Sequence, residues 1–322
     1  DGGDDFDYIA WYWQDDRVNW SAPLAMDPGD PEVLYFGTYR VWKSMNGGNS
    51  WMDVSGDLTA GIDQYFYTVT TIAVSPLDNN IVIAGTGDGM VHVSTNGGLI
   101  WDDVTEGLPD RWVTRVLGDP FDENTIYATV SGFRWDEPLA HVYKSTDLGQ
   151  TWESISGNLA GVPVNDIVVD PEHEGFIYVA TDAGMFFTND GGTNWSGINE
   201  GIYNVPIVAM KIHNPSRQLV IGTYGLSMYR LDLNDLVTGV KEKKGPDTEF
   251  TVYPNPFTRS LHLEGPVELV DDFRLYDISG KHIMWADKVR LSDMPELKPG
   301  MYYLHLLDAS GKTIAVEKVV RR

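Results

Sequence analysis

The stretch Ser145-Thr146-Asp147-Leu148-Gly149-Gln150-Thr151-Trp152 decides the fold, because its pattern occurs four times in this chain of 322 residues. Each copy has a hydroxyl residue, then Asn or Asp two positions later, Gly two positions after that, and Trp at the end. The other three copies are Ser44 to Trp51, Ser94 to Trp101 and Thr188 to Trp195. The four tryptophans are 50, 51 and 43 residues apart, so the first part of the chain is a repeat array.

The segments around each copy predict four short antiparallel strands. Before each copy, one apolar run ends in a Pro-containing turn and a second β-rich run ends in Gly or a turn, as in Ile72 to Pro76 and Ile81 to Gly85. A third strand enters the copy and a fourth begins at its Trp. Such a repeat is the size of one propeller blade. We therefore predict an all-β fold, a β-propeller of four-stranded blades, with a fifth repeat over 207–233 that keeps only three strands.

The repeated octapeptide is predicted to be a tight hairpin between the third and fourth strands. Its glycine allows positive φ, and its polar side chains accept hydrogen bonds from the amides of the turn. The tryptophan buries a large area between sheets. We assign this structural role to Ser44, Asn46, Gly48, Trp51, Ser94, Asn96, Gly98, Trp101, Ser145, Asp147, Gly149, Trp152, Thr188, Asp190, Gly192 and Trp195.

This pattern resembles the Asp-box, or BNR, repeat. The repeat occurs in sialidases, xyloglucanase-type glycoside hydrolases, sortilin-like receptors and photosystem-assembly propellers. The resemblance implies a β-propeller but no single activity, because one fold carries many functions. Sialidases would also require three arginines around a carboxylate, and no Arg-Ile-Pro motif precedes the first copy here.

The number of blades has two interpretations. Five repeats are visible within residues 1–233, whereas propellers of this type more often have six to eight blades. We expect these five to be part of a larger ring that is incomplete at Asp1, because Asp1-Gly2-Gly3-Asp4 resembles the middle of a loop. The sequence opens without a Met or a basic and apolar leader, so we expect that a signal peptide or a longer segment has been removed upstream. Alternatively, the segment Phe6 to Trp13 supplies the outer strand that the fifth repeat lacks and closes a five-bladed ring.

A step in charge indicates a second domain. Residues 1–248 contain 13 basic and 36 acidic residues, whereas the remainder contains 10 and 11. Residues 234–248 are charged, contain Gly and Pro, and have no periodicity, so they are predicted to be a linker. Residues 249–322 alternate in short strands, which favours a small immunoglobulin-like β-sandwich.

The C-terminal domain resembles the type A sorting domain of the type IX secretion system of Bacteroidota. The motif residues are Tyr253, Pro254, Asn255, Pro256, Tyr276, Asp277, Gly280, Lys281, Gly300, Tyr302 and Lys318. The resemblance implies export through the periplasm to the cell surface or medium. It also implies that residues 249–322 bind the translocon and its outer-membrane shuttle. Without the resemblance, the chemistry of these residues favours the alternative that the domain is a β-sandwich that only stabilises the protein.

Composition excludes several classes of function. With a formal net charge of −24, the chain lacks the basic surface that binding to nucleic acid requires. No apolar run is long enough to span a membrane as a helix. The chain has no cysteine, and its seven histidines show no metal-ligand spacing. We expect no cofactor and no transition metal. Calcium at Asp1, Asp4, Asp5 and Asp7 is the weaker alternative to a mobile acidic end.

Candidate binding residues follow from the geometry of a propeller. If the hairpins occupy one rim of the ring, a ligand would bind at the opposite rim, on the loops between strands 4 and 1 and strands 2 and 3. The third repeat has the longest such insertion. The candidates are Tyr65, Trp112, Arg134, Trp135, Asp136, Glu137 and Tyr203. Aromatic faces with Arg and carboxylates suit a sugar or a peptide. The alternative is that Trp112 and Trp135 pack against neighbouring blades.

We therefore expect a secreted or cell-surface propeller that is a binding or scaffold module for a polysaccharide or a protein. The alternative is a glycoside hydrolase of the xyloglucanase or sialidase-like type, although the sequence favours no enzymatic activity and identifies no catalytic residue. A hydrolase would show two carboxylates facing each other across a deep groove. A third possibility is a structural subunit that docks through its C-terminal domain.

Overall fold

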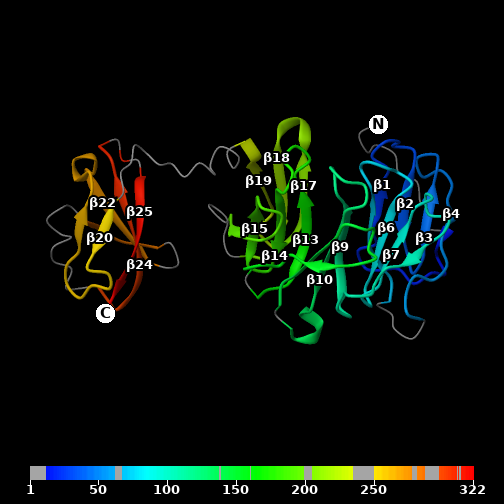
Figure 1. Cartoon of the computed structure of the whole chain (residues 1–322), viewed down its shortest axis with the longest axis horizontal. Coiled ribbons are helices and arrows are strands. Elements are labelled where there is room, and N and C mark those ends of the chain that lie inside the picture. The colour runs from blue at the N-terminus through cyan, green and yellow to red at the C-terminus, as the bar shows by residue number, and fades with distance from the viewer. Residues whose placement is uncertain are drawn as a thin grey trace. The chain divides into compact units, whose positions relative to one another are not determined.

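The computed structural model describes residues 12–61, 67–137, 139–159, 161–198, 205–234, 250–277, 281–286, 297–309, 311 and 313–322. The chain forms two compact units, Asp1–Asn234 and Asp235–Arg322. Both units consist of β-strands and short 3₁₀ turns (Figure 1). No helix in the described ranges is long and apolar enough to cross a membrane.

The first unit is an array of five β-sheets, which are the blades of a β-propeller. Blade 1 contains β1 (Leu24–Met26), β2 (Leu34–Gly37), β3 (Val41–Ser44) and β4 (Met52–Asp53). Blade 2 contains β5 (Val69–Val74), β6 (Val82–Thr86), β7 (Val91–Ser94) and β8 (Asp102–Asp103). Blade 3 contains β9 (Trp112–Gly118), β10 (Ile126–Ser131), β11 (His141–Ser145) and β12 (Glu153–Ser154), with the 3₁₀ turn η2 (Phe133–Trp135) between β10 and β11.

Blades 4 and 5 complete the described array. Blade 4 contains β13 (Val164–Val169), β14 (Ile177–Thr181), β15 (Gly184–Thr188) and β16 (Ser196–Gly197). Blade 5 has three described strands, β17 (Ile207–His213), β18 (Gln218–Thr223) and β19 (Met228–Asp232), with η3 (Asn214–Ser216) between the first two. The first strand of each blade contacts the first strand of the next, from β1 to β17. The predicted all-β propeller is confirmed, and the three strands predicted for the fifth repeat are all present among the described residues.

The repeated octapeptides form the turns between the third and fourth strands of blades 1 to 4. In each, the hydroxyl oxygen of Ser or Thr accepts a hydrogen bond from the glycine amide, for example Gly149 N to Ser145 Oγ at 2.7 Å. The Asn or Asp oxygen accepts the amide four residues later, for example Thr151 N to Asp147 Oδ1 at 2.8 Å. In blade 4, hydrogen bonds from Thr188 and Asn194 lower the pKa of Asp190 to about 2. The turn therefore favours the ionised carboxylate.

The octapeptide tryptophans join each blade to the blade before it. Trp101 Nε1 donates to Val54 O at 3.1 Å, Trp152 Nε1 donates to Val104 O at 2.8 Å and Trp195 Nε1 donates to Ile155 O at 2.9 Å. Each acceptor is the residue that follows the fourth strand of the preceding blade. The indole therefore fixes the spacing of successive blades as well as filling the space between them.

A buried ion pair holds blade 5 against blade 4. Arg217, just before β18, donates from Nη1 to Asp170 Oδ1 at 2.9 Å and from Nη2 to Asp170 Oδ2 at 2.7 Å. The Asp170 side chain is fully buried. Burial opposes its ionisation, but the bonds from Arg217 and from the Glu172 amide keep the pKa of Asp170 below its ordinary value.

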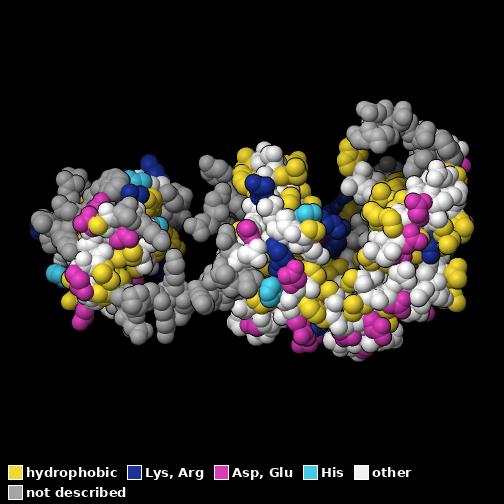
Figure 2. Space-filling model, turned by 90° about the horizontal axis from the view of Figure 1, so that it is seen from above, with side chains coloured by type: hydrophobic (Ala, Val, Ile, Leu, Met, Phe, Trp, Pro, Cys, Tyr) yellow, Lys and Arg dark blue, Asp and Glu magenta, His cyan; other side chains and the backbone are white. Residues whose placement is uncertain are grey.

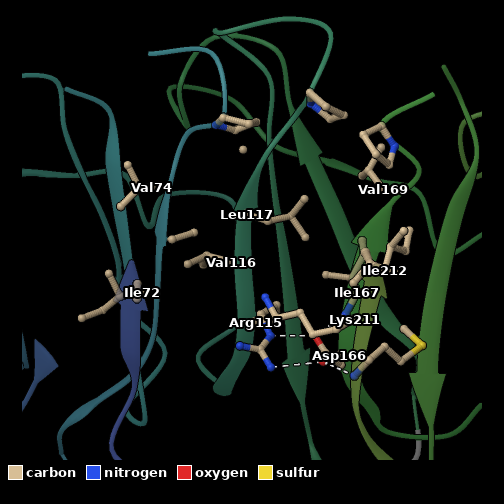
Figure 3. Close-up of a pocket in the computed structure, with 18 of the residues that line it drawn as sticks. Ile72, Val74, Arg115, Val116, Leu117, Asp166, Ile167, Val169, Lys211 and Ile212 are labelled. Atoms are coloured by element: carbon tan, nitrogen blue, oxygen red, sulfur yellow. Dashed lines mark hydrogen bonds and ion pairs between the residues drawn. The ribbon is translucent and has the colours of Figure 1, made fainter. Parts of the chain in front are cut away.

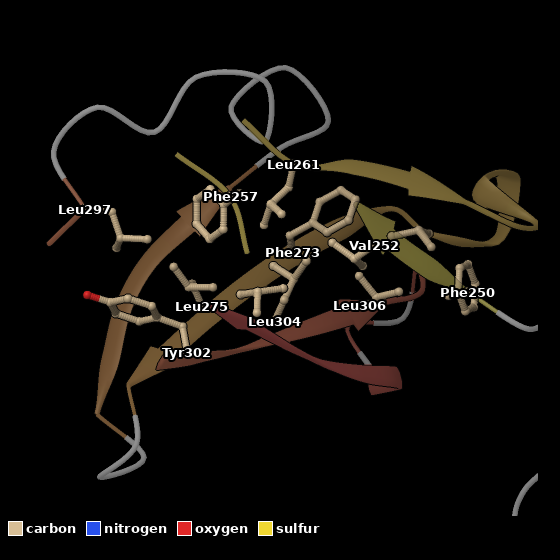
Figure 4. Close-up of a cluster of buried hydrophobic side chains, with 12 residues drawn as sticks. Phe250, Val252, Phe257, Leu261, Phe273, Leu275, Leu297, Tyr302, Leu304 and Leu306 are labelled. Carbon is tan, nitrogen blue, oxygen red and sulfur yellow. The ribbon is translucent and has the colours of Figure 1, made fainter. Parts of the chain in front are cut away.

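The second unit has six described strands. A sheet with strand order β23-β22-β24-β25 comprises β22 (Asp272–Asp277), β23 (His282–Ala286), β24 (Gly300–Leu307) and β25 (Thr313–Arg321). β20 (Thr251–Tyr253) and β21 (His262–Glu264) form a second sheet, and η4 (Val267–Leu269) follows it. Alternate residues of β24, namely Tyr302, Leu304 and Leu306, are buried in the core. Figure 4 shows them facing Phe257, Phe273 and Val252.

The motif Tyr253-Pro254-Asn255-Pro256-Phe257 is paired with the last strand. The Asn255 side chain donates to Lys318 O at 2.7 Å and accepts from Val320 N at 2.9 Å. Phe257 forms a parallel bridge to Arg321. Asn255 thus satisfies both a donor and an acceptor on β25, as a neighbouring strand would.

Replacing Asn255 by Ala is expected to destabilise the second unit by about 1–2 kcal/mol, because two hydrogen bonds to β25 are lost. Hydrogen exchange of the full chain would show faster exchange in the peptides that cover 251–257 and 318–322, with the propeller peptides unchanged. Asn255→Asp keeps the acceptor for Val320 N and loses the donor, so it should have an intermediate effect. Equal exchange in all three proteins would contradict this role.

Candidate carbohydrate-binding groove

A groove of about 410 Å³ lies where blades 3, 4 and 5 meet. It is formed at the ends of the strands that are opposite the octapeptide turns. Trp112 begins β9, Ser131 ends β10, and Pro163 and Pro206 immediately precede β13 and β17. The remaining lining residues are Thr114, Phe133, Arg134, Asn165, Asp182, Val208 and Tyr224. The groove is thus built from the ends of first and second strands and from the loops between strands 4 and 1 and strands 2 and 3.

The walls of the groove are largely aromatic. Phe133 and Tyr224 are 73% and 78% exposed, although large aromatic side chains normally bury most of their area. Trp112 is half-buried, and the guanidinium carbon of Arg134 lies 4.2 Å from its ring centroid. This cation–π contact holds Arg134 beside the aromatic surface. Exposed rings of this kind offer flat apolar faces to a ligand.

The polar groups of the groove are fixed by other contacts. Asn165 Nδ2 donates to Asp182 Oδ1 at 2.9 Å and to Ile207 O at 3.0 Å. Asn165 therefore joins blades 4 and 5 and holds the Asp182 carboxylate at the groove. Asp182 is the only carboxylate among the described lining residues. The groove thus presents aromatic faces with one carboxylate, one amide and one guanidinium.

A second cluster lies beside η2. Glu137 forms ion pairs with Arg111 Nε at 2.6 Å and with His141 Nε2 at 2.9 Å. The hydrogen bond from Arg111, and then that from His141, lower the pKa of the Glu137 carboxyl. Arg111 also lies over the Trp135 ring, 5.2 Å from its centroid. These bonds tie the insertion to blade 3 and leave Glu137 engaged within the protein.

The structure brings only part of the predicted set together. Trp112 and Arg134 line the groove, whereas Trp135, Asp136 and Glu137 do not. Tyr65 and Tyr203 lie outside the described residues. Phe133, Asn165, Asp182 and Tyr224 line the groove but were not predicted. A sequence signal for Asp182 and Tyr224 did exist, because each follows the second strand of its repeat, as the predicted insertion does in blade 3. A ligand-binding role for any of these residues remains a prediction.

A larger cavity of about 590 Å³ is lined by the first strands of all five blades. Figure 3 shows Arg115 and Asp166 at one end of it, with apolar side chains such as Ile72, Leu117 and Ile212 along its walls. Arg115 Nε lies 2.6 Å from Asp166 Oδ1, and Asp166 also accepts the amides of Ile167 and Met210. Asp166 is 1% exposed, so this carboxylate joins blades 3, 4 and 5 rather than facing a ligand.

Acidic side chains do not form a metal site in the described ranges. No group of three or more His, Asp or Glu residues there could hold a metal ion. Asp119, Asp122, Glu174 and Asp190 line a pocket of about 430 Å³ near the octapeptide turns. Asp119 in that pocket already accepts the Tyr127 hydroxyl at 2.7 Å. The predicted alternative calcium residues, Asp1 to Asp7, lie outside the described residues.

The fold and the second unit together define the class of protein. Residues 251–321 match the family model described as "Secretion system C-terminal sorting domain". The protein is therefore a β-propeller with a type IX sorting domain, and this domain indicates export to the cell surface or secretion. The same match indicates that this domain interacts with the secretion system.

The propeller is similar to enzymes of family GH74. The chain is 28% identical over 209 residues to a xyloglucanase of Hypocrea jecorina, covering 54% of this chain and 25% of that protein. It is 26% identical over 191 residues to a probable oligoxyloglucan-reducing end-specific xyloglucanase of Neosartorya fischeri, covering 58% and 18%. The Niastella koreensis GH74 enzyme superposes with a TM-score of 0.54 at 16% identity, covering 92% of this chain and 50% of that one. The chain thus spans about a quarter or less of these curated relatives, and the structural likeness shows the fold.

Proposed function

We propose that the propeller binds an extracellular polysaccharide through the groove between blades 3, 4 and 5. The observation that carries this proposal is the exposure of Phe133 and Tyr224 beside Trp112 and Arg134. Sugar rings have apolar faces that pack on aromatic rings, and their hydroxyls bond to amide, carboxylate and guanidinium groups. The xyloglucanase relatives support a β-glucan such as xyloglucan as the first ligand to test.

We also infer that the four octapeptides are Asp-box repeats and that their role is structural. Their hydroxyl group bonds to the carboxyl or amide side chain and to the glycine amide, and their tryptophans join neighbouring blades. The aromatic groove lies at the other ends of the strands. Folding and binding therefore use different residues of the same repeat.

Replacing Phe133 or Trp112 by Ala is expected to weaken xyloglucan binding by about 10- to 100-fold, since an aromatic side chain of this size contributes about 1.5–3 kcal/mol when covered. Calorimetric titration with xyloglucan oligosaccharides would measure the change. Phe121→Ala is the matched control, because this exposed ring lies at the opposite ends of the blade 3 strands. Phe133→Ala should leave the melting temperature unchanged. Affinities that are equal in all four proteins would contradict the proposal.

The second candidate is hydrolysis of the same polysaccharide, which is favoured by the xyloglucanase relatives. Against it, the described linings of the groove and of the central cavity hold one carboxylate each, Asp182 and Asp166. Hydrolysis requires a pair. We infer that binding rather than bond cleavage is the activity of this chain. Release of reducing ends from xyloglucan by the unmodified chain would instead establish the hydrolase.

A further inference from the structure

The central cavity, which is lined by the first strands of all five blades, carries more basic than acidic side chains. Its described lining contains Arg115 and Lys211 but one carboxylate, Asp166. This excess runs against the composition of residues 1–248, which hold 13 basic and 36 acidic residues. Figure 2 shows Lys and Arg side chains in the hollow of the first unit. In Figure 3, Lys211 lies beside Arg115 and Asp166, so the basic groups are concentrated at one end of the cavity.

The Asp166 carboxylate is fully occupied by other contacts. Its Oδ1 accepts hydrogen bonds from Arg115 Nε at 2.6 Å and from the Ile167 amide at 2.8 Å. Its Oδ2 accepts from Arg115 Nη2 at 3.1 Å and from the Met210 amide at 2.7 Å. An ionised carboxylate has about four acceptor positions. Asp166 therefore has no acceptor position left for Lys211, the residue that follows Met210 on β17.

Lys211 and one amino group of Arg115 are left without an acceptor. Among the described residues, the Lys211 ammonium forms no hydrogen bond or ion pair, and Arg115 uses only Nε and Nη2. The row of cross-strand neighbours that contains Lys211 runs through Val220 to Arg230 and adds no acid. Two positive charges and one negative charge leave a net charge of +1 at this end of the cavity. Because low-dielectric walls concentrate the field of an unpaired charge, this end attracts an anion.

The remaining walls of the cavity are largely apolar. Leu24 and Met26 of β1 line it and are 64% and 57% exposed, and Figure 3 shows Ile72, Leu117 and Ile212 along the walls. No aromatic side chain is among the described lining residues, in contrast to the groove. The volume of about 590 Å³ lies within the range of small-molecule sites, about 300–1,000 Å³. The cavity therefore offers a small molecule an apolar surface with a cationic end.

We propose that the central cavity binds a small organic acid that carries one carboxylate on an apolar body. The carboxylate would accept hydrogen bonds from Lys211 Nζ and Arg115 Nη1, and the body would contact the apolar walls. A net charge of +1 balances a single carboxylate, whereas a doubly charged phosphate would leave a negative charge uncompensated among apolar groups. The cavity and the groove share no lining residue, so this site is independent of the polysaccharide site.

Titration of the full chain with hexanoate and with hexanamide tests the charge requirement, because the two molecules differ mainly in the anionic group. Measured by NMR of the ligand, hexanoate is expected to bind at least about tenfold more tightly, since charge-assisted hydrogen bonds are about twice as strong as neutral ones. Equal affinities for the two, or tighter binding of inorganic phosphate, would overturn the proposal. Displacement of hexanoate by a xyloglucan oligosaccharide would also overturn it, because the hexanoate would then occupy the groove.

Lys211→Met removes the ammonium and nearly keeps the length of the side chain. We expect the affinity for hexanoate to fall at least about tenfold, with the melting temperature unchanged, because Lys211 has no partner among the described residues. Lys144→Met is the matched control, since Lys144 lies over the Tyr127 ring in the pocket near the octapeptide turns, and it should bind hexanoate as the unmodified chain does. Equal affinities in the two variants would contradict the proposed site. A lower melting temperature of Lys211→Met would also contradict it, by showing that the ammonium already has a partner within the chain.

Discussion

Replacing Arg217 by Met is expected to lower the free energy of unfolding of the propeller by about 3–5 kcal/mol, because it leaves the buried Asp170 carboxylate without its charged partner. Asp170 is fully buried, and both of its oxygens bond to the guanidinium. The Glu172 amide and His173 remain as partners, but neither replaces a bidentate cation. Urea unfolding followed by tryptophan fluorescence would measure the loss.

The double variant Arg217→Met with Asp170→Asn separates the cost of the buried charge from the cost of lost packing. We expect it to recover a large part of the loss, because the neutral amide still accepts from Glu172 N and carries no charge. The pH dependence gives a second check. The pKa of Asp170 is below its ordinary value, so its stabilisation is present above that ordinary value and is lost as the pH falls further. A double variant no more stable than Arg217→Met would contradict this explanation.

Replacing Gly192 by Ala is expected to cost about 2–5 kcal/mol. Two independent effects add at this position. The backbone φ is +101°, a conformation that strains a residue with a side chain by about 1–2 kcal/mol. The added Cβ would also lie 2.7 Å from Ile155 Cβ and 2.9 Å from Ile155 O, and overpacking of this kind costs about 1–3 kcal/mol. Thermal unfolding monitored by tryptophan fluorescence would report the loss.

The adjacent glycine provides a matched control. Gly191 has φ +72°, but a Cβ there would meet no atom within 4 Å. Gly191→Ala should therefore show the backbone cost alone, about 1–2 kcal/mol. The difference between the two variants measures the contact between blades 3 and 4. Equal destabilisation by the two substitutions would mean that this contact contributes nothing.

Most of the fold could be predicted from the repeated octapeptide. A hydroxyl, an Asn or Asp, a Gly and a Trp at fixed spacing determine a hairpin through bonds within eight residues, such as those of Ser145, Asp147 and Gly149. The alternating apolar residues around it determine the strands. The same holds in the sorting domain, where Tyr302, Leu304 and Leu306 share the buried face of β24. Each of these signals lies within one strand or turn.

The candidate groove could be predicted from the sequence only in part. Arg134 was found because it lies in a long insertion, and Trp112 because it lies at the connection between strands 4 and 1. Asn165 lies within β13, and Asp182 and Tyr224 lie in short loops. They become neighbours of Trp112 only through the angles between blades 3, 4 and 5. Those angles depend on contacts between blades, such as the Trp195 indole on Ile155 O and Arg217 on Asp170.

By itself, the sequence determined that the chain is a series of four-stranded units followed by a sorting domain, because hairpin and strand formation depend on residues close together in the chain. Only the tertiary structure decided which loops meet and which carboxylates are engaged. The physical reason is that the packing of one sheet on the next depends on side chains about fifty residues apart, and no local pattern records the angle at which they meet.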